Sequence, residues 1–293
     1  MALKWSRIAI SFIISTTGVS ALADPPILQT VEAIQRTNVT KADVIIIGDT
    51  NHELSTIRDA VAQSLPAFKQ SNPSIDCLFI EADARMQPAF DEYARSKRPD
   101  YKGTIMQASE DQLSPLERSG AVKTNAATAF TESLLKAARS SSIRVIAGDI
   151  DFSSDLGDRI QAVSMVMSLG VSDEKTQKTA AQLIIDDRSQ LFAQKITESK
   201  KSGLCHASIV LIGIGHMIKT FGDVPVVKIQ DRVKASGLTI STLAAISGSC
   251  KTDKNPDKQK KLICSELASG KSFSALIVDR SADDDPLFAI IGK

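Results

Sequence analysis

The sequence predicts an α/β protein with a mainly parallel central sheet, covered by helices on both faces, and a site at the carboxyl ends of the strands. Short apolar runs rich in β-branched residues alternate along the chain with segments of helical periodicity. Continuous apolar runs are typical of strands that are buried on both faces between two helix layers. The expected strands are residues 44–48, 77–82, 143–148, 207–213, 225–229, 238–246 and 274–279.

Two of the intervening segments carry a clear helical stripe. Ile57, Val61 and Leu65 have the spacing of one helix face. A longer helix is expected to be capped by Ser172 and to end near Gly203. Its expected apolar face comprises Ala180, Leu183, Ile184, Leu191 and Ile196.

Composition and charge narrow the class of protein. The 293 residues are 43% hydrophobic and 24% charged, with a formal net charge of +1. That charge lacks the basic excess of nucleic-acid-binding proteins, and the composition is not that of a disordered chain. No internal repeat or low-complexity linker interrupts the pattern, so we expect residues 24–293 to form a single domain. Residues 97–125 are polar and weakly patterned, which predicts an insertion or a lid.

Residues 1–23 are expected to be a secretory signal peptide. Lys4 and Arg7 precede a short apolar run over residues 8–14, and residues 21–23 have the A-x-A form of a cleavage site. The run is too short to span a membrane, and no later stretch reaches about 20 apolar residues. We therefore expect an exported protein, periplasmic or secreted, without a membrane span.

Four cysteines in an exported chain predict disulfide bonds. Cys250 and Cys264 flank a stretch rich in Lys and Asp, so we pair them around an exposed loop. Cys77 and Cys205 each begin an apolar run, which suits two neighbouring strands. The cysteine spacing does not match a zinc motif.

Unusual polar residues follow four of the predicted strands. His52 comes after the first strand, Glu81 ends the second, Asp149 ends the third, and His216 follows the fourth. Because the carboxyl ends of parallel strands meet at one edge of a sheet, we expect these side chains to share a pocket. His206 precedes its strand, at the opposite edge, and is expected to be structural.

The order and spacing of these motifs resemble the broad superfamily that includes the erythromycin esterases, the ChaN-like haem-binding proteins and the TraB/Tiki metalloproteases. Residues 48–52 have the Gly-x-x-x-His spacing of the esterases, with Asp49 where Glu is usual. Residues 143–149 are similar to the esterase strand that ends in Gly-x-Asp.

Two further motifs resemble the other branches. Asp187-Arg188 and the residues after them are similar to the Arg-bearing helix of the TraB/Tiki proteins. Residues 213–225 resemble the Gly-x-Gly-His and Gly-Val-Pro motifs of the ChaN and Tiki branches. The resemblance spans residues 41–230 and takes its motifs from different branches, so it does not single out one branch's function.

The resemblance implies a hydrolase that acts on an ester or peptide substrate, with His52, Glu81 and His216 in its site and Arg188 and Asp149 nearby. In an esterase-like reaction an imidazole accepts a proton from water, Glu81 orients it, and Arg188 stabilises an oxyanion or binds an anionic substrate. In a Tiki-like reaction His52, Glu81 and His216 hold a divalent metal, zinc or manganese, which activates water. The sequence leaves both chemistries open.

Haem or iron binding without catalysis is the alternative that the ChaN-like branch implies. That branch uses tyrosine as its iron ligand, and the only two tyrosines, Tyr93 and Tyr101, both follow the second predicted strand. An exported effector that acts on a host target would also fit this scaffold. Substrate and oligomeric state are not assigned by the sequence.

Overall fold

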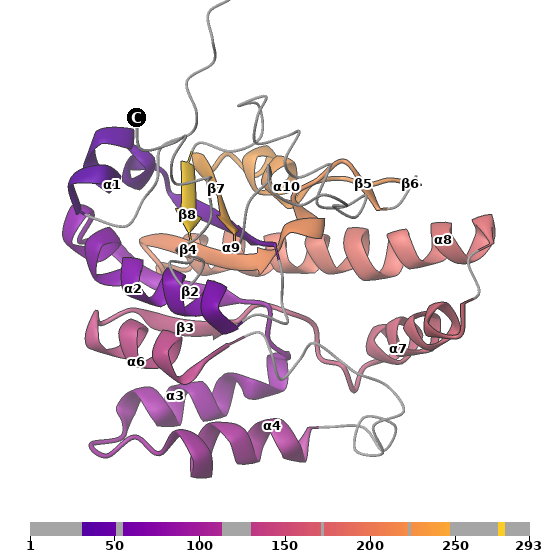
Figure 1. The fold of residues 1–293 in the computed structure, drawn as a ribbon, viewed down its shortest axis with the longest axis horizontal. Helices are drawn as coiled ribbons and strands as arrows, with labels where there is room; N and C mark the ends of the chain where they lie inside the picture. The colour runs from indigo at the N-terminus through magenta and orange to yellow at the C-terminus, as the bar shows by residue number, and fades with distance from the viewer. Residues whose placement is uncertain are drawn as a thin grey trace, which may run out of the picture.

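The centre of the fold is a parallel six-stranded sheet (Figure 1). A computed structural model describes residues 31–50, 55–112, 130–170, 173–221, 224–246 and 275–278. The strands lie in the order β3-β2-β4-β1-β7-β8, and each neighbouring pair is parallel. Their bounds are β1 (Val44–Asp49), β2 (Ile75–Ile80), β3 (Arg144–Ala147), β4 (Ala207–Gly213), β7 (Ile240–Ile246) and β8 (Ala275–Val278). The predicted fold class is confirmed.

Burial on both faces explains why the central strands are continuously apolar. Every residue of β1 is buried. Ile45 and Ile47 belong to the apolar core on one face of the sheet, whereas Val44 and Ile46 belong to the core on the other face. Successive side chains of a strand point to opposite faces, so a strand between two helix layers needs apolar residues at each position.

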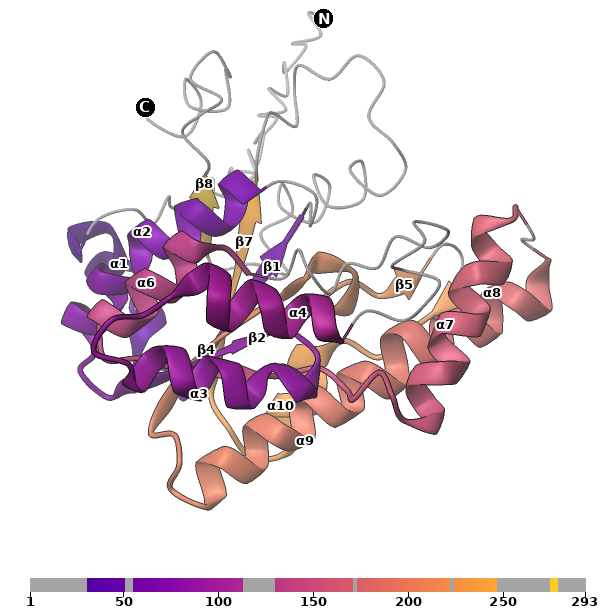
Figure 2. The same cartoon turned by 90° about the horizontal axis from the view of Figure 1, so that it is seen from below.

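Helices form the two layers that bury these faces. One layer contains α1 (Val31–Thr37), α2 (Ser55–Ser71), α3 (Gln87–Arg95) and α6 (Glu132–Ser140), and the other contains α9 (Arg188–Lys201) and α10 (Ile229–Ala235). The predicted stripe of Ile57, Val61 and Leu65 is fully buried on α2. Figure 2 shows that α7 (Asp155–Ser168) and α8 (Glu174–Ala180) extend beyond the sheet, where they share a small apolar core of their own.

The long helix expected after residue 172 is interrupted by a π-helix. It consists of α8, the π-helix η5 (Ala181–Asp187) and then α9, while Ser172 lies outside the described residues. Asp173 is the residue that caps it, because its side chain accepts a hydrogen bond from the Thr176 amide. A π-helix has more residues in each turn than an α-helix, so it changes which face the following residues occupy. The α-helical period continued across η5 therefore placed Leu191 on the apolar face, which was wrong. Leu191 is 37% exposed, and its neighbour Phe192 is buried instead.

The predicted strand at residues 225–229 is also wrong. Val224–Pro225 forms β6, which pairs with β5 (Thr220–Phe221) in a separate antiparallel ribbon. Proline has no amide hydrogen for a ladder, which limits strand pairing here. Ile229 instead begins α10, where it and Val233 are buried one helical turn apart.

Part of the segment expected to be a lid is helical. The π-helix η3 (Tyr101–Met106) and α4 (Gln107–Asp111) lie beside α3, as Figure 2 shows. Residues 113–125 lie outside the described residues, so the lid remains a prediction.

A disulfide bond joins two neighbouring strands, as expected from their cysteines. Cys77 on β2 is bonded to Cys205, two residues before β4. Cys250, Cys264 and the expected signal peptide lie outside the described residues. Within the described ranges, no helix is long and apolar enough to cross a membrane.

Candidate functional site

The carboxyl ends of three strands and the start of α9 bring four of the predicted site residues together. Glu81 follows β2, Asp149 follows β3, and His216 ends η6 (Ile214–His216), the short helix after β4. Arg188 reaches them from the first position of α9. His52 lies outside the described residues, so its place in the pocket remains a prediction.

Arg188 is the cation around which the carboxylates gather. Its Nε donates to Asp149 Oδ1 at 3.0 Å, and its Nη2 donates to Glu81 Oε1 at 2.5 Å and also to Asp149 Oδ2. Its Nη1 has a long contact of 3.5 Å with the Ile184 carbonyl. The guanidinium also lies 5.8 Å from the centre of the Phe152 ring. Two of the three nitrogens are therefore committed to carboxylates.

The electrostatics keep this arginine charged. Burial by itself lowers the pKa of Arg188, but the nearby carboxylates of Asp149 and Glu81 outweigh that effect and raise the pKa above its ordinary value. The two acids in turn depend on this cation, because an unpaired buried carboxylate is costly. Arg188 thus holds the ends of β2 and β3 together more than it presents a free cation to a substrate.

Glu81 has an acceptor role at each of its oxygens. Besides the bond from Arg188 to Oε1, its Oε2 accepts a hydrogen bond from the Gly213 amide at 2.7 Å. His216 Nε2 lies 3.5 Å from Glu81 Oε1. A carboxylate with this many donors around it is held in its ionised form.

His216 is buried and is held by a residue that sequence reasoning missed. Its Nδ1 lies 2.8 Å from the hydroxyl of Ser189, the second residue of α9. Ser189 is completely buried. Its position next to Arg188 was the one feature of the sequence that could have indicated a place in the site. Because the π-helix changes the helical period before α9, the sequence pattern does not show which helix face Ser189 occupies.

A second buried ion pair supports the strand that leads to His52. Asp49 at the end of β1 accepts a hydrogen bond from Arg58 Nη1 of α2 at 3.2 Å, and both side chains are buried. Burial lowers the pKa of Arg58, and the charge of Asp49 opposes that shift. The Asp that replaces the usual Glu of the esterase motif therefore has a structural partner here.

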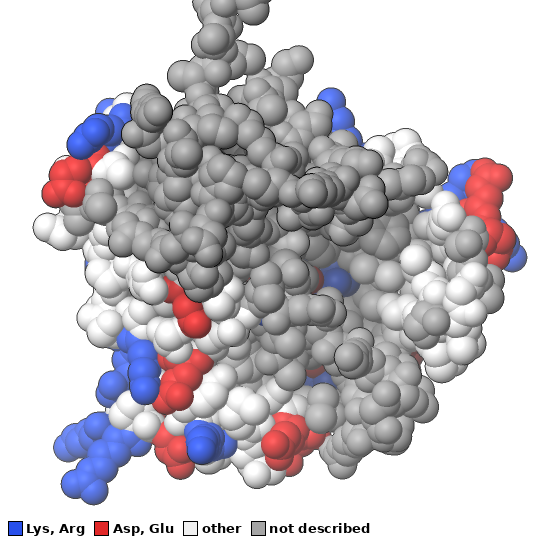
Figure 3. All heavy atoms as spheres, in the orientation of Figure 1, with Lys and Arg blue, Asp and Glu red and all other residues white. Residues whose placement is uncertain are grey.

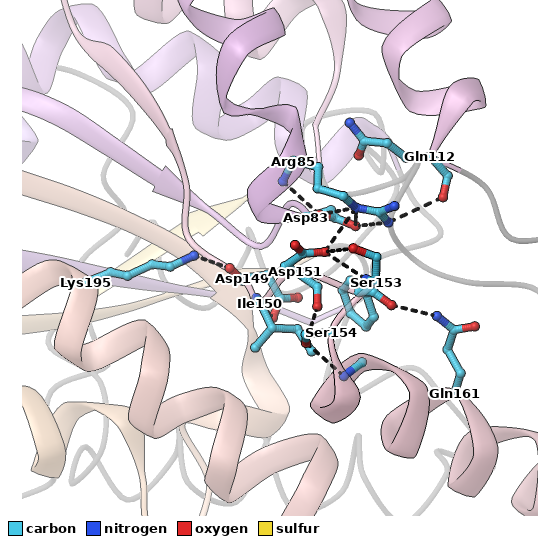
Figure 4. A network of polar contacts seen from close by, with 12 residues as sticks. Asp83, Arg85, Gln112, Asp149, Ile150, Asp151, Ser153, Ser154, Gln161 and Lys195 are labelled. Carbon is cyan, nitrogen blue, oxygen red and sulfur yellow. Dashed lines mark hydrogen bonds and ion pairs between the residues drawn. The ribbon is translucent and has the colours of Figure 1, made fainter.

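Another polar network lies beside Asp149 at the end of β3 (Figure 4). Arg85 donates to Asp83 and lies 3.3 Å from Asp151 Oδ1. Lys195 of α9 donates to the main-chain carbonyl of Asp149 and, at 3.3 Å, to that of Ala147. Burial lowers the pKa of Lys195. Together with Arg188, Lys195 ties α9 to the end of β3.

The described donors do not fit a metal ion as they stand. Glu81 already accepts hydrogen bonds from Arg188 and Gly213, and the Arg188 guanidinium lies beside Glu81 where a metal ion would compete with it. Elsewhere in the described residues, ligand atoms of Asp76, Cys77 and Cys205 lie within 4.8 Å of one another. Both sulfurs belong to the disulfide, which leaves one carboxylate as a ligand.

The two tyrosines lie away from this site. Tyr93 and Tyr101 form an edge-to-face pair with ring centres 6.5 Å apart, in the core layer on the α3 side of the sheet. Burial raises the pKa of both phenols. An iron-binding tyrosine acts as a phenolate, so this environment does not favour haem ligation by either residue.

Charged side chains on the visible face are mixed in sign. Figure 3 shows Lys and Arg interspersed with Asp and Glu around the edge of that face, and no large basic area appears among the described residues there.

His206, at the opposite edge of the sheet, is exposed and pairs with Asp76 at 2.6 Å. It is therefore placed apart from His216.

Comparison with known proteins identifies the fold. No protein-family model matches the chain, and no curated protein sequence matches it significantly. Among solved structures, a mutant of the erythromycin esterase EreC in its open conformation matches 76% of this chain and 76% of its own, with a TM-score of 0.50 and 11% identity.

Two further structures are similar over most of this chain. Haem-bound ChaN of Campylobacter jejuni matches 78% of this chain and 93% of its own, with a TM-score of 0.49 and 13% identity. The type III effector HopBA1 matches 83% and 95%, with a TM-score of 0.44 and 14% identity. The esterase and ChaN bear the names of two of the branches that the sequence motifs resemble, and at such identities the likeness shows the fold alone.

Proposed function

We propose that this chain is an exported hydrolase that acts on an ester or peptide substrate at the carboxyl edge of its sheet. One observation carries the proposal: Glu81 and Asp149 come from two strands and pair with Arg188, and His216 comes from a third strand and lies 3.5 Å from Glu81. His52 follows three residues after the end of β1, which is the neighbour of β4 in the sheet. Parallel strands bring such residues to a common edge.

In this proposal His52 is the general base that accepts a proton from the attacking water. An imidazole has an ordinary pKa of about 6.5, which suits proton transfer near neutral pH. Glu81 and His216 form the polar wall of the site. Arg188 holds Glu81 and Asp149 in place, and its Nη1 is the nitrogen left to reach a developing oxyanion.

Water activation by an imidazole, without a metal, is the chemistry that we favour. The oxygens of Glu81 already accept hydrogen bonds from Arg188 and Gly213. A metal-dependent version would require the metal ion to displace the Arg188 guanidinium from Glu81. Elemental analysis of the purified mature chain tests this point, with near-stoichiometric zinc or manganese as the contrary result.

Hydrolysis itself is tested with p-nitrophenyl esters and short reporter peptides. We expect turnover by the mature chain, and its loss in His52→Ala with a free energy of unfolding within about 1 kcal/mol of the wild type. His206→Ala is the matched control, because that histidine lies at the opposite edge of the sheet. Turnover that survives His52→Ala would remove the base from the proposal. A stoichiometric Soret band on haem titration, without turnover, would replace it by haem binding.

A further inference from the structure

We infer that Ser189 is a positioning residue that fixes the tautomer of His216, holding its proton on Nε2 and its lone pair on Nδ1. The inference deepens the proposed function, since it concerns the same site, but it rests on contacts of the described residues alone. Ser189 Oγ lies 2.8 Å from His216 Nδ1, and both residues are buried.

Glu81 is the first of two groups that favour one ring nitrogen of His216 as the carrier of the proton. Its carboxylate accepts hydrogen bonds from the Arg188 guanidinium and the Gly213 amide, so it is ionised and acts only as an acceptor. His216 Nε2 lies 3.5 Å from Glu81 Oε1. A lone pair on Nε2 would face the carboxylate oxygen and be repelled, whereas an N–H would be attracted. Glu81 therefore favours Nε2 as the protonated nitrogen.

The other nitrogen then has to accept. In a neutral imidazole with its proton on Nε2, the Nδ1 carries a lone pair. Among the described residues, the hydroxyl of Ser189 is the group placed to donate to it, and a serine hydroxyl can rotate to do so. Ser189 and Glu81 thus select the same tautomer from opposite sides of the ring.

The geometry assigns Ser189 to positioning rather than to nucleophilic attack. Its side chain is completely buried, so a substrate carbonyl cannot reach the hydroxyl without opening α9. Ser189 lies inside the continuous helical segment formed by η5 and α9, one residue after Arg188. In this tautomer the Nε2–H of His216 lies on the side of Glu81, 3.5 Å from Oε1, and proton abstraction is left to His52. A metal bound through Nε2 would need the opposite tautomer.

The tautomer can be read without any activity. Nitrogen-15 spectra of histidine-labelled protein, recorded at about pH 9 where an ordinary imidazole is neutral, distinguish a protonated from an unprotonated ring nitrogen. We expect the signals of His216 to show Nε2–H in the wild type and a mixture of tautomers in Ser189→Ala. His206 is the internal reference, because its Nδ1 faces the Asp76 carboxylate at 2.6 Å and should be the protonated nitrogen. Single histidine variants assign the three residues.

Catalysis supplies the second measurement. Ser189→Ala should lower kcat for p-nitrophenyl acetate roughly 10-fold or more with little change in KM, as loss of a tautomer-fixing partner does elsewhere. Ser64→Ala is the matched control: Ser64 is also a fully buried helical serine, bonded to the Ala60 carbonyl at 3.0 Å on α2. Equal thermal stability of the two variants separates positioning from a general folding defect.

Several results would overturn the inference. These are a wild-type His216 with its proton on Nδ1, a doubly protonated ring at about pH 9, an unchanged tautomer in Ser189→Ala, or a shift to Nδ1–H when Zn²⁺ is added. Covalent labelling of Ser189 by a fluorophosphonate would make it a nucleophile instead. If the wild type turned over no ester or peptide, the proposed function would fail while the spectra still decided the tautomer.

Discussion

Arg188 pairs with Glu81 and Asp149, two acids that the sequence analysis placed in the same site as catalytic residues. The resemblance implied a guanidinium that binds an anionic substrate or an oxyanion. In the structure Nε and Nη2 are already paired with Asp149 and Glu81. The fork geometry of the side chain matters here, because one guanidinium can satisfy carboxylates that arrive from two strands.

Replacing Arg188 should therefore affect stability as well as activity. We expect Arg188→Met to lower the free energy of unfolding by about 3–5 kcal/mol, since the buried carboxylate of Asp149 and the partly buried carboxylate of Glu81 lose their cation. Arg188→Lys should restore part of that loss, but its activity should stay low because an ammonium cannot replace the fork. Urea denaturation and ester turnover give the two readings.

The matched control is Arg144→Lys. Arg144 also contacts both oxygens of one carboxylate, that of Asp91, at 3.2 Å, but its side chain is 43% exposed. Exposed pairs contribute little to stability, so this variant should behave like the wild type. An Arg188→Lys protein with full activity would reduce Arg188 to a replaceable ion pair.

At the scale of elements, the π-helix before α9 decides which residues enter the site. Arg188 and Ser189 are the first two residues after η5, and both contact the group around Glu81 and His216. Within η5, Ile185 packs near Gly215, the residue before His216. π-Helical segments are often found at functional sites, and here the segment sets the rotation of α9 relative to α8.

Removing one residue from η5 should test this role. Deleting the exposed Gln182 should favour α-helical bonding and rotate either α8 or α9 by about 100°. We expect ester turnover to be lost while far-ultraviolet circular dichroism retains the helical signal. The substitution Gln182→Ala keeps the residue count and should retain turnover. Turnover in the deletion variant would show that the register of α9 is not critical.

Another element-scale contact is the clasp formed by Asp43 just before β1. Its carboxylate accepts from the Thr239 hydroxyl at 2.6 Å and pairs with Lys200 of α9 at 2.9 Å, so it joins β1, β7 and α9. Hydrogen bonds from the Thr239 side chain, then the bond from Lys200, lower the pKa of Asp43 from 3.8 to about 2. A carboxyl group whose pKa is lower in the folded state stabilises the fold at pH values above its unfolded-state pKa. That contribution is lost as the pH falls through the folded-state pKa.

Stability should therefore depend on Asp43 in a defined pH window. Between pH 7 and about pH 5, Asp43→Asn should lower the urea midpoint by a constant amount. As the pH falls from about 4 to about 2, the difference from the wild type should shrink toward zero, because the wild-type carboxylate becomes protonated there. Thr239→Val should reproduce a smaller loss with the same pH dependence. A difference that stays constant down to pH 2 would contradict the clasp.

At the scale of the whole molecule, the disulfide closes the largest covalent loop of the described chain. Cys77 and Cys205 are 128 residues apart, and the loop between them includes α3, α6, β3, α7 and α9. A cross-link over a long loop restricts the unfolded chain, which favours the folded state. The bond lies at the amino edge of the sheet, away from Glu81 and His216.

Loss of this bond should weaken the fold without changing the chemistry. We expect Cys77→Ala/Cys205→Ala to lower the free energy of unfolding by about 4 kcal/mol, with ester turnover retained where the protein is folded. Dithiothreitol should do the same to the wild type. Cys250→Ala/Cys264→Ala should cost less, about 3 kcal/mol, if that predicted pair closes its loop of roughly 15 residues. An oxidised and reduced protein of equal stability would contradict this account.

The fold class, and the acids and imidazole that meet at the strand ends, could be predicted from the amino-acid sequence alone. Strands between two helix layers must be apolar throughout, so β1, β2 and β4 can be recognised in the sequence as apolar runs. Because parallel strands end at one edge of a sheet, Glu81, Asp149 and His216 could be expected at the same edge. The cysteine pair could be predicted for the same reason. Local pattern is enough where burial dictates each residue.

The partners of those residues, and the course of the chain between strands, required the folded structure. The π-helix has no apolar period of its own, so the burial of Phe192 and Ser189 could not be predicted from the sequence. The apolar residues at 225–229 fit either a strand or the start of α10. The ion pairs of Arg188 and Arg58, and the Ser189 bond to His216, join residues from different elements. Such contacts depend on the packed geometry of the helices against the sheet, which no local pattern encodes.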